Sequence, residues 1–273
     1  MNPLRLLRVT SLTLLVCAST LLAQQPPAPA GAPPAEGARG GPGAGGGRGG
    51  GGGRGGFSIA PRPADDATGF VPIFDGKSLA GWDGDLTFWR AEDGVIVGES
   101  TPEKVVKVNS FLIWRGGTVK NFELKLEYRM NGTNSGIQYR SVELPDVGQW
   151  ILKGYQADMD FINQHTGNIH DERGRAFLSR RGKFSRALGG SSFKEIGTLG
   201  DPDELKGAVK INDWNSYHII ARDSVIIHVL NGKVMAILID EDPERALEGV
   251  LGFQMHVGPP FKIEYRNILL RKL

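Results

Sequence analysis

The amino-acid sequence predicts an all-β domain in which two sheets pack against each other as a sandwich. Apolar and polar residues alternate with a period of two between residues 122 and 129, as expected for a strand with one buried face. Short turn sequences such as Asn231-Gly232 separate such runs and are typical of hairpins. No long segment shows helical periodicity, although residues 242–248 are long enough for one helical turn. Many short strands without alternating helices favour the two-sheet sandwich.

Strands are expected where the alternation, or a run of β-branched residues, is bounded by turns. The expected strands cover residues 122–129, 137–140, 155–161, 214–222, 225–230, 233–239, 250–257 and 263–270. A further short strand is expected around residue 169. The runs 225–230 and 233–239 flank Asn231-Gly232, so they are predicted to pair as a hairpin.

Three segments differ sharply in composition. Residues 1–23 combine a basic start, with Arg5 and Arg8, with an apolar run and a small residue at Ala23, which is typical of a secretory signal peptide. Residues 24–69 are rich in Pro, Ala, Gly and Arg and are interpreted as a disordered linker, because nothing in them buries apolar area. Residues 70–273 carry the apolar patterning and are long enough for one sizeable core.

Composition excludes several classes of protein. The net charge is +2, with 32 basic and 30 acidic residues, so nucleic-acid binding has no electrostatic support. The Arg-Gly-Gly triplets of the linker are interpreted as a basic spacer. The apolar run is too short for a membrane span, and lipid anchoring through Cys17 is not expected, because Val16 precedes it. We therefore expect an exported protein, periplasmic or secreted, without disulfides.

One face of the expected strands is unusually rich in planar polar groups. Amide, carboxylate and guanidinium groups can each bind a pair of sugar hydroxyls in a fixed geometry. The alternative is a solvated sheet face with cross-strand charge pairs, and alternation alone leaves both open. Glu172 belongs to the face only if its strand continues past His170. The alternation assigns to this face Gln138, Arg140, Gln156, Asp158, Asp160, His170, Glu172, Gln254 and His256.

A series of short motifs, in order along the whole domain, resembles the 3-keto-disaccharide hydrolase domain family. The motifs lie at residues 70–82, 89–94, 121–124, 134–140, 154–158, 214–217, 230–232, 252–256 and 265–268. The departures are Gln156 and Asp158, where many members carry Glu and Gln. The resemblance implies a concanavalin A-like jelly-roll sandwich that acts on 3-keto-glycosides.

The chemistry implied by this resemblance sets requirements for the site. A ketone at C3 acidifies the proton at C2, so that a base can remove it and the substituent at C1 can leave by β-elimination; water addition completes a net hydrolysis. Such a site needs a base, a group that stabilises the enolate oxygen, and an acid for the leaving group.

Each requirement has candidates in the sequence. Asp158 or Asp160 is expected as the base, and Arg140, His170 or His256 as the group that stabilises the enolate. No cofactor is certain, but Asp158, Asp160, His165 and His170 form a candidate set for a divalent cation. The residues expected to bind the sugar are Gln138, Gln156, Trp150, Glu172, Arg175 and Gln254.

Two other functions fit the same residues. A non-catalytic carbohydrate-binding module can share this fold, because jelly rolls host both binding and catalysis. An ordinary glycoside hydrolase needs two carboxylates on either side of the scissile bond, roughly 5–10 Å apart. Asp158 and Asp160, two residues apart on one strand, could meet the lower end of this range.

Overall fold

A computed structural model describes residues 68–190 and 192–273. The predicted signal peptide and nearly all of the predicted linker lie outside the described residues. Two sheets face each other across an apolar core, which confirms the predicted all-β jelly-roll sandwich. In the described part of the chain, no helix is long and apolar enough to cross a membrane.

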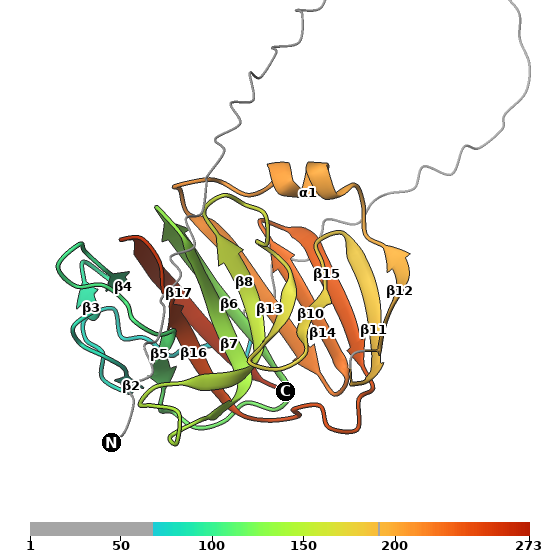
Figure 1. Ribbon diagram of the computed structural model, residues 1–273, viewed down its shortest axis with the longest axis horizontal. Coiled ribbons are helices and arrows are strands. Elements are labelled where there is room, and N and C mark those ends of the chain that lie inside the picture. The colour runs from blue at the N-terminus through green and yellow to red at the C-terminus, as the bar shows by residue number, and fades with distance from the viewer. Residues whose placement is uncertain (1–67, 191) are drawn as a thin grey trace, which may run out of the picture. The chain divides into compact units, whose positions relative to one another are not determined.

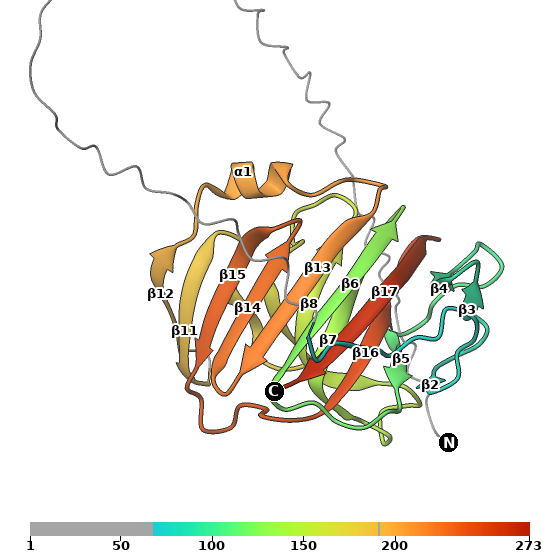
Figure 2. The same cartoon turned by 180° about the vertical axis from the view of Figure 1, so that it is seen from behind.

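The first sheet, which Figure 2 shows in front, has ten strands among the described residues. Its order is β12 (Ser192–Thr198), β11 (Lys183–Gly189), β15 (Lys233–Asp240), β14 (Val225–Leu230), β13 (Asn215–Arg222), β6 (Phe122–Met130), β17 (Lys262–Lys272), β4 (Val95–Glu99) and β3 (Trp89–Glu92), with β1 (Val71–Pro72) paired to β17. Neighbours are antiparallel except β11 and β15, which pair in parallel.

The second sheet has seven strands among the described residues and faces the viewer in Figure 1. Its order is β10 (Ala176–Ser179), β9 (Ile169–Glu172), β8 (Leu152–Asp160), β7 (Asn134–Glu143), β16 (Val250–Met255), β5 (Ser110–Trp114) and β2 (Trp82–Asp83). The expected strands and the 225–230/233–239 hairpin are all present.

The one described helix is where the sequence analysis expected none. Helix α1 (Pro202–Gly207) begins after Asp201, whose side chain accepts hydrogen bonds from two backbone N–H groups of the first turn, as an N-cap residue does. Residues 242–248, where one helical turn was expected, form no helix. The sequence signal for α1 was the N-cap residue Asp201 followed by Pro202. The helix has only six residues, too few to show a helical hydrophobic period.

The core lies between the sheets and follows the predicted alternation. In β6, Phe122, Leu124, Leu126 and Tyr128 are buried, whereas the intervening residues are half-buried. The second sheet contributes aromatic rings, among them Tyr139 and Tyr155, which stack with centroids 5.7 Å apart.

A histidine lies fully buried in this core. His228 on β14 bonds to the Tyr139 hydroxyl through Nε2 at 2.9 Å and to the Tyr217 hydroxyl through Nδ1 at 3.2 Å. The contact joins β7 of one sheet to β13 and β14 of the other. Burial lowers the pKa of His228 to about 3, so the imidazole stays neutral, with one nitrogen donating and the other accepting.

Acidification is expected to weaken the fold through His228. Between its usual pKa of 6.5 and about 3, the unfolded chain binds a proton at this site and the folded chain does not, so stability falls as the pH drops. At pH 5 the loss is about 2 kcal/mol relative to pH 7. Urea unfolding of wild type and His228→Gln at both pH values measures it. Parallel losses in the two proteins would show that another group is responsible.

Candidate active site

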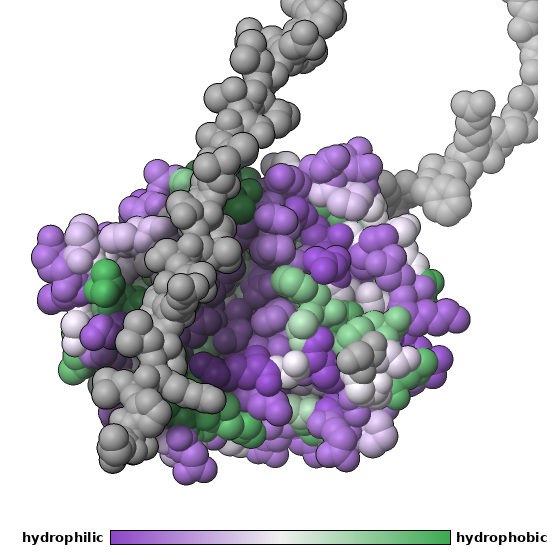
Figure 3. Space-filling view, viewed as in Figure 1, coloured by the Kyte–Doolittle hydropathy of each residue, from purple (hydrophilic) through white to green (hydrophobic). Residues whose placement is uncertain are grey.

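Polar side chains from four neighbouring strands meet on the outer face of the second sheet. Gln156 on β8 is paired with Gln138 on β7 and with His170 on β9, and paired residues share a face. Asp158 follows two residues after Gln156 and therefore lies on that face as well. In Figure 3 the centre of this side of the molecule is hollowed and hydrophilic. The residues that the alternation brings to this active-site face are Gln138, Gln156, Asp158, His170, Glu172 and Gln254.

A chain of hydrogen bonds leads to the Asp158 carboxyl group. Ser141 Oγ donates to Gln138 Oε1, Gln138 Nε2 donates to Gln156 Oε1 at 3.2 Å, and Gln156 Nε2 donates to Asp158 Oδ1 at 2.9 Å. Gly136 makes room for it, because a Cβ there would lie 2.3 Å from Gln156 Cδ. These hydrogen bonds fix the orientation of Asp158 and leave its Oδ2 without a hydrogen bond to any described residue.

Asp158 is a buried carboxyl group without a cation beside it. It is 4% exposed, and among the described residues no ion pair reaches it. Burial raises its pKa to about 8, with Glu172 and Asp160 adding to the rise and the bond from Gln156 opposing it. The group is therefore largely protonated at neutral pH.

His170 is shifted in the opposite direction. Burial lowers its pKa, against the attraction of Glu172 and Asp171, so the imidazole is neutral at neutral pH. Its buried Nδ1 makes no hydrogen bond and lies 3.8 Å from Glu172 Oε2. Glu172 also accepts a 3.3 Å hydrogen bond from Asn109.

Several buried polar atoms of the face lack partners. Gln254 is fully buried, yet neither its amide nitrogen nor its amide oxygen makes a hydrogen bond within the described residues. The same holds for Nδ1 of His165, whose ring stacks on Phe177 at 5.1 Å. Leaving buried polar groups unpaired is costly, so these atoms mark where a ligand or ordered water binds.

Asp160 does not join Asp158 as a second catalytic carboxylate. Its side chain accepts hydrogen bonds from the backbone N–H groups of Gln164, His165 and Thr166, each 2.8 Å long. These bonds hold the loop after β8 and occupy its oxygens. The predicted cation set containing Asp160 and His165 is also not assembled, since the described residues contain no group of three or more such ligands placed to hold a metal ion.

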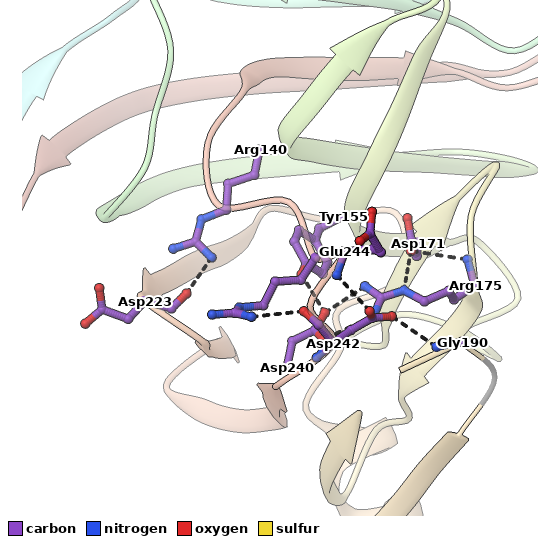
Figure 4. Close-up of polar contacts among 10 residues, drawn as sticks. Arg140, Tyr155, Asp171, Arg175, Gly190, Asp223, Asp240, Asp242 and Glu244 are labelled. Atoms are coloured by element: carbon purple, nitrogen blue, oxygen red, sulfur yellow. Dashed lines mark hydrogen bonds and ion pairs between the residues drawn. The ribbon is translucent and has the colours of Figure 1, made fainter. Parts of the chain in front are cut away.

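Arg140, which is predicted to stabilise the enolate, does not lie on the active-site face. A bulge in β7 interrupts the alternation after Tyr139, and Arg140 adopts a left-handed backbone with φ of 47°. Its guanidinium donates to the main-chain oxygens of Lys120 at 2.7 Å and Asp223 at 2.8 Å. Lys120 lies in the connection from β5 to β6 and Asp223 in the turn from β13 to β14, and Arg140 points toward Asp223 (Figure 4).

Arg175, which is predicted to bind the sugar, lies off the active-site face, at a cavity of about 560 Å³. Its guanidinium is held by Asp171 at 2.9 Å, Asp240 at 2.7 Å and Asp242 at 3.0 Å, as Figure 4 shows. Asp240 also accepts a 2.5 Å hydrogen bond from Tyr155 Oη. This Arg175 cluster ties the β9–β10 turn to the end of β15.

Trp150 and His256 lie at the margins of the active-site face. Trp150 is in the hairpin between β7 and β8 and donates from Nε1 to Asp83 at 2.8 Å. His256 directly follows β16, and its Nδ1 bonds to the main-chain oxygen of Val257. Neither forms a hydrogen bond with Asp158 among the described residues. No sequence pattern pointed to Asn109, whose partner Glu172 is 63 residues away, or to Ser141, which reaches Gln138 across the bulge in β7.

The family model described as 3-keto-alpha-glucoside-1,2-lyase-like domain matches residues 69–271. The chain belongs to this family. A curated relative from Bacteroides thetaiotaomicron, named 3-keto-disaccharide hydrolase, is 38% identical over 177 residues. The match covers 61% of this chain and 57% of that relative, so the chain spans little more than half of the relative's length.

Solved structures share the fold of this lyase-like domain. A crystal structure of a candidate glycosyl hydrolase from Parabacteroides distasonis ATCC 8503 superposes with a TM-score of 0.51 at 21% identity, covering 76% of this chain and 95% of that one. A second candidate glycosyl hydrolase of that organism gives 0.49 at 21% identity, covering 75% and 99%.

Loss of Arg175 is expected to destabilise the lyase-like domain strongly. Arg175→Ala leaves buried carboxylates without their cation, which costs about 3–5 kcal/mol. Arg186→Ala is the matched control, because its ion pair with Glu241 is 46% and 40% exposed and is worth less than about 1 kcal/mol. Denaturant unfolding compares them; equal losses would show that the Arg175 cluster is no stronger than a surface pair.

Asp158→Asn is expected to stabilise the same domain. Between pH 3.8 and about 8 the folded chain keeps a proton that the unfolded chain has lost, so the contribution of Asp158 falls as the pH rises. The amide removes this penalty, on the order of 5 kcal/mol at pH 8 and about 2 kcal/mol at pH 5. Asp160→Asn should instead lower the melting temperature, because it weakens the loop bonds. A destabilised Asp158→Asn at pH 8 would contradict the raised pKa.

Proposed function

We propose that the domain cleaves 3-keto-glycosides on its active-site face, by elimination followed by hydration. The family membership and the name of the curated relative support this substrate class. The mechanism rests on two neighbouring groups whose pKa values are shifted in opposite directions. At neutral pH, Asp158 is protonated and His170 is unprotonated. Paired shifts of this kind assign an acid and a base.

In the first half of the reaction, the neutral imidazole of His170 takes the proton from C2. The electron pair of that bond delocalises onto the C3 oxygen as an enolate, which then forms the C1–C2 double bond and restores the ketone as the C1–O bond breaks. The Asp158 carboxyl group protonates the departing oxygen. This assignment reverses the role that the sequence analysis gave to Asp158, since a carboxyl group with a pKa of about 8 donates rather than accepts a proton below that pH.

In the second half, water adds across the same double bond. Asp158, now a carboxylate, takes a proton from the water molecule while the water oxygen forms a bond to C1. Protonated His170 returns its proton to C2. The sum is hydrolysis, and both groups regain their starting states. No nicotinamide is consumed, because the ketone is already present in the substrate.

The enolate oxygen needs a hydrogen-bond donor now that Arg140 is turned inward. Gln254 lies beside β7 on the active-site face, and its buried amide N–H group is unpartnered. A preorganised donor in a water-poor site stabilises developing negative charge. Gln254 therefore takes the role expected of Arg140, and Gln138 and Gln156 orient Asp158.

Release of the leaving group from a 3-keto-glucoside, with its unoxidised parent beside it, tests this proposal. We expect release from the keto compound alone, with kcat/KM falling above about pH 8 as Asp158 loses its proton. Asp158→Asn and His170→Gln should each lower kcat by roughly 100-fold or more, and Arg186→Ala should not.

Two outcomes would contradict the proposal. A kcat/KM that rises through pH 8 would make Asp158 the base. No release from any 3-keto-glycoside, together with glycan binding, would favour a carbohydrate-binding module. Adding EDTA to the same assay tests the predicted cation, and the predicted export is tested separately by the cellular location of the protein.

A further inference from the structure

Glu172 lies beside the proposed base and takes no part in the proton transfers described above. It follows His170 by two residues on β9, so the two side chains share the active-site face. The side chains of His170 and Glu172 are 20% and 12% exposed, and Glu172 Oε2 lies 3.8 Å from His170 Nδ1. This separation is too long for a hydrogen bond. Such contacts in an unliganded site often tighten when the substrate binds.

Glu172 is held in place from the other side of the sheet. Its Oε1 accepts a hydrogen bond of 3.3 Å from Asn109 Nδ2, and Asn109 Oδ1 accepts one of 2.9 Å from the backbone N–H group of Val257. Asn109 directly precedes β5, and three strands lie between β5 and β9 in the sheet order. The contact therefore spans the active-site face, and the second carboxylate oxygen, Oε2, is the one near His170.

Packing against a phenylalanine holds the imidazole ring of His170. Phe177 on β10 is the register partner of His170, and the two ring centroids are 5.0 Å apart at an interplanar angle of 52°. His165 stacks on the same phenylalanine at 5.1 Å. Because Nδ1 of His170 is buried and makes no hydrogen bond within the described residues, packing fixes the ring and leaves open which nitrogen carries the proton. Glu172 is placed to determine it, since a group bonded to one ring nitrogen sets the role of the other.

The charge of Glu172 is not compensated by a cation. Its neighbour Asp171 is paired with Arg175 at 2.9 Å, whereas Glu172 has no Lys or Arg partner among the described residues. A nearby negative charge favours the protonated imidazole. The other titratable or charged groups around the ring are Asp158 on β8, His165 in the loop after β8, Asp171, and Arg180, whose guanidinium lies 4.4 Å from the ring centroid of Phe177.

We propose that Glu172 is a positioning residue that acts through His170. Glu172 accepts a hydrogen bond from Nδ1–H of His170, which leaves the lone pair on Nε2 to take the proton from C2. While the ring is protonated, the carboxylate stabilises its positive charge, until the proton returns to C2. Glu172 itself neither gains nor loses a proton. The inference rests on the proposed function for the reaction, but the contact between Glu172 and His170 does not.

Kinetics of Glu172→Gln in the full chain, on a 3-keto-glucoside, test the proposal. We expect kcat to fall by roughly 10-fold or more, with KM changed by less than about 2-fold, because Glu172 does not touch the sugar. Loss of the negative charge lowers the pKa of both His170 and Asp158, so both limbs of the pH profile of kcat/KM should move to lower pH. Glu172→Asp keeps the charge and should restore the limbs.

Glu195→Gln is the matched control, because it makes the same change in an exposed ion pair with Lys183. It should alter neither kcat nor the pH profile. A rise in KM of Glu172→Gln with both limbs in place would mean that Glu172 binds the sugar, as the sequence analysis expected, and would overturn the proposal.

A spectroscopic measurement separates this proposal from the proposed function. Long-range ¹H–¹⁵N NMR signals of the His170 ring, identified by their absence in His170→Gln, report which nitrogen is protonated. Wild type should show the Nδ1–H form, and Glu172→Gln should shift the ring toward the Nε2–H form. Asn109→Ala should do so to a smaller extent, because Glu172 loses its support. This result supports the proposal even if no 3-keto-glycoside is cleaved. Equal tautomer ratios in wild type and Glu172→Gln would overturn it, whether or not the protein shows turnover.

Discussion

The position of the active-site face depends on the ion-paired cluster around Arg175. Tyr155 and Asp171 alternate along β8 and β9 with Gln156 and His170. The cluster holds the first two through Asp240 and Arg175 on the inner side of the sheet. Because successive residues of a strand point to opposite faces, fixing the inner pair also fixes the outer pair. An ion-paired cluster on one side of the sheet thereby sets the geometry of the proposed acid and base on the other.

Charged side chains are compensated on the inner face of the second sheet and uncompensated on its outer face. On the inner side, Arg175 is compensated by three carboxylates and Arg140 by main-chain oxygens. On the outer side, Asp158 is buried with only an amide donor. A carboxyl group in that position keeps its proton because no nearby cation stabilises the carboxylate form. The same absence of a cation that weakens the fold at high pH therefore suits Asp158 to the role of proton donor in the proposed reaction.

Alternation was enough to predict the strands and most of the active-site face, because Gln138, Gln156 and Gln254 lie in regular stretches of β7, β8 and β16. It failed for Arg140, where a bulge shifts the side chain to the inner face. Alternation made no prediction for Arg175, which follows a turn whose direction only the folded chain defines. Asp160 has the right alternation, but the local loop captures its carboxylate. The pKa shifts of Asp158 and His170 were beyond the sequence, because both arise from burial by distant segments.

One continuous stretch of chain, residues 169–198, supplies the outermost strands at one side of both sheets: β9 and β10 in one, β11 and β12 in the other. It joins the sandwich only at its rim, and β11 docks there in parallel on β15. His170 belongs to this stretch, whereas Asp158, Gln156 and Gln254 belong to interior strands. Replacement of this one peripheral segment would therefore remove the proposed proton acceptor and leave the proposed proton donor and the amides in place. The architecture thus separates the two halves of the proposed acid–base pair between the rim of the sandwich and its interior.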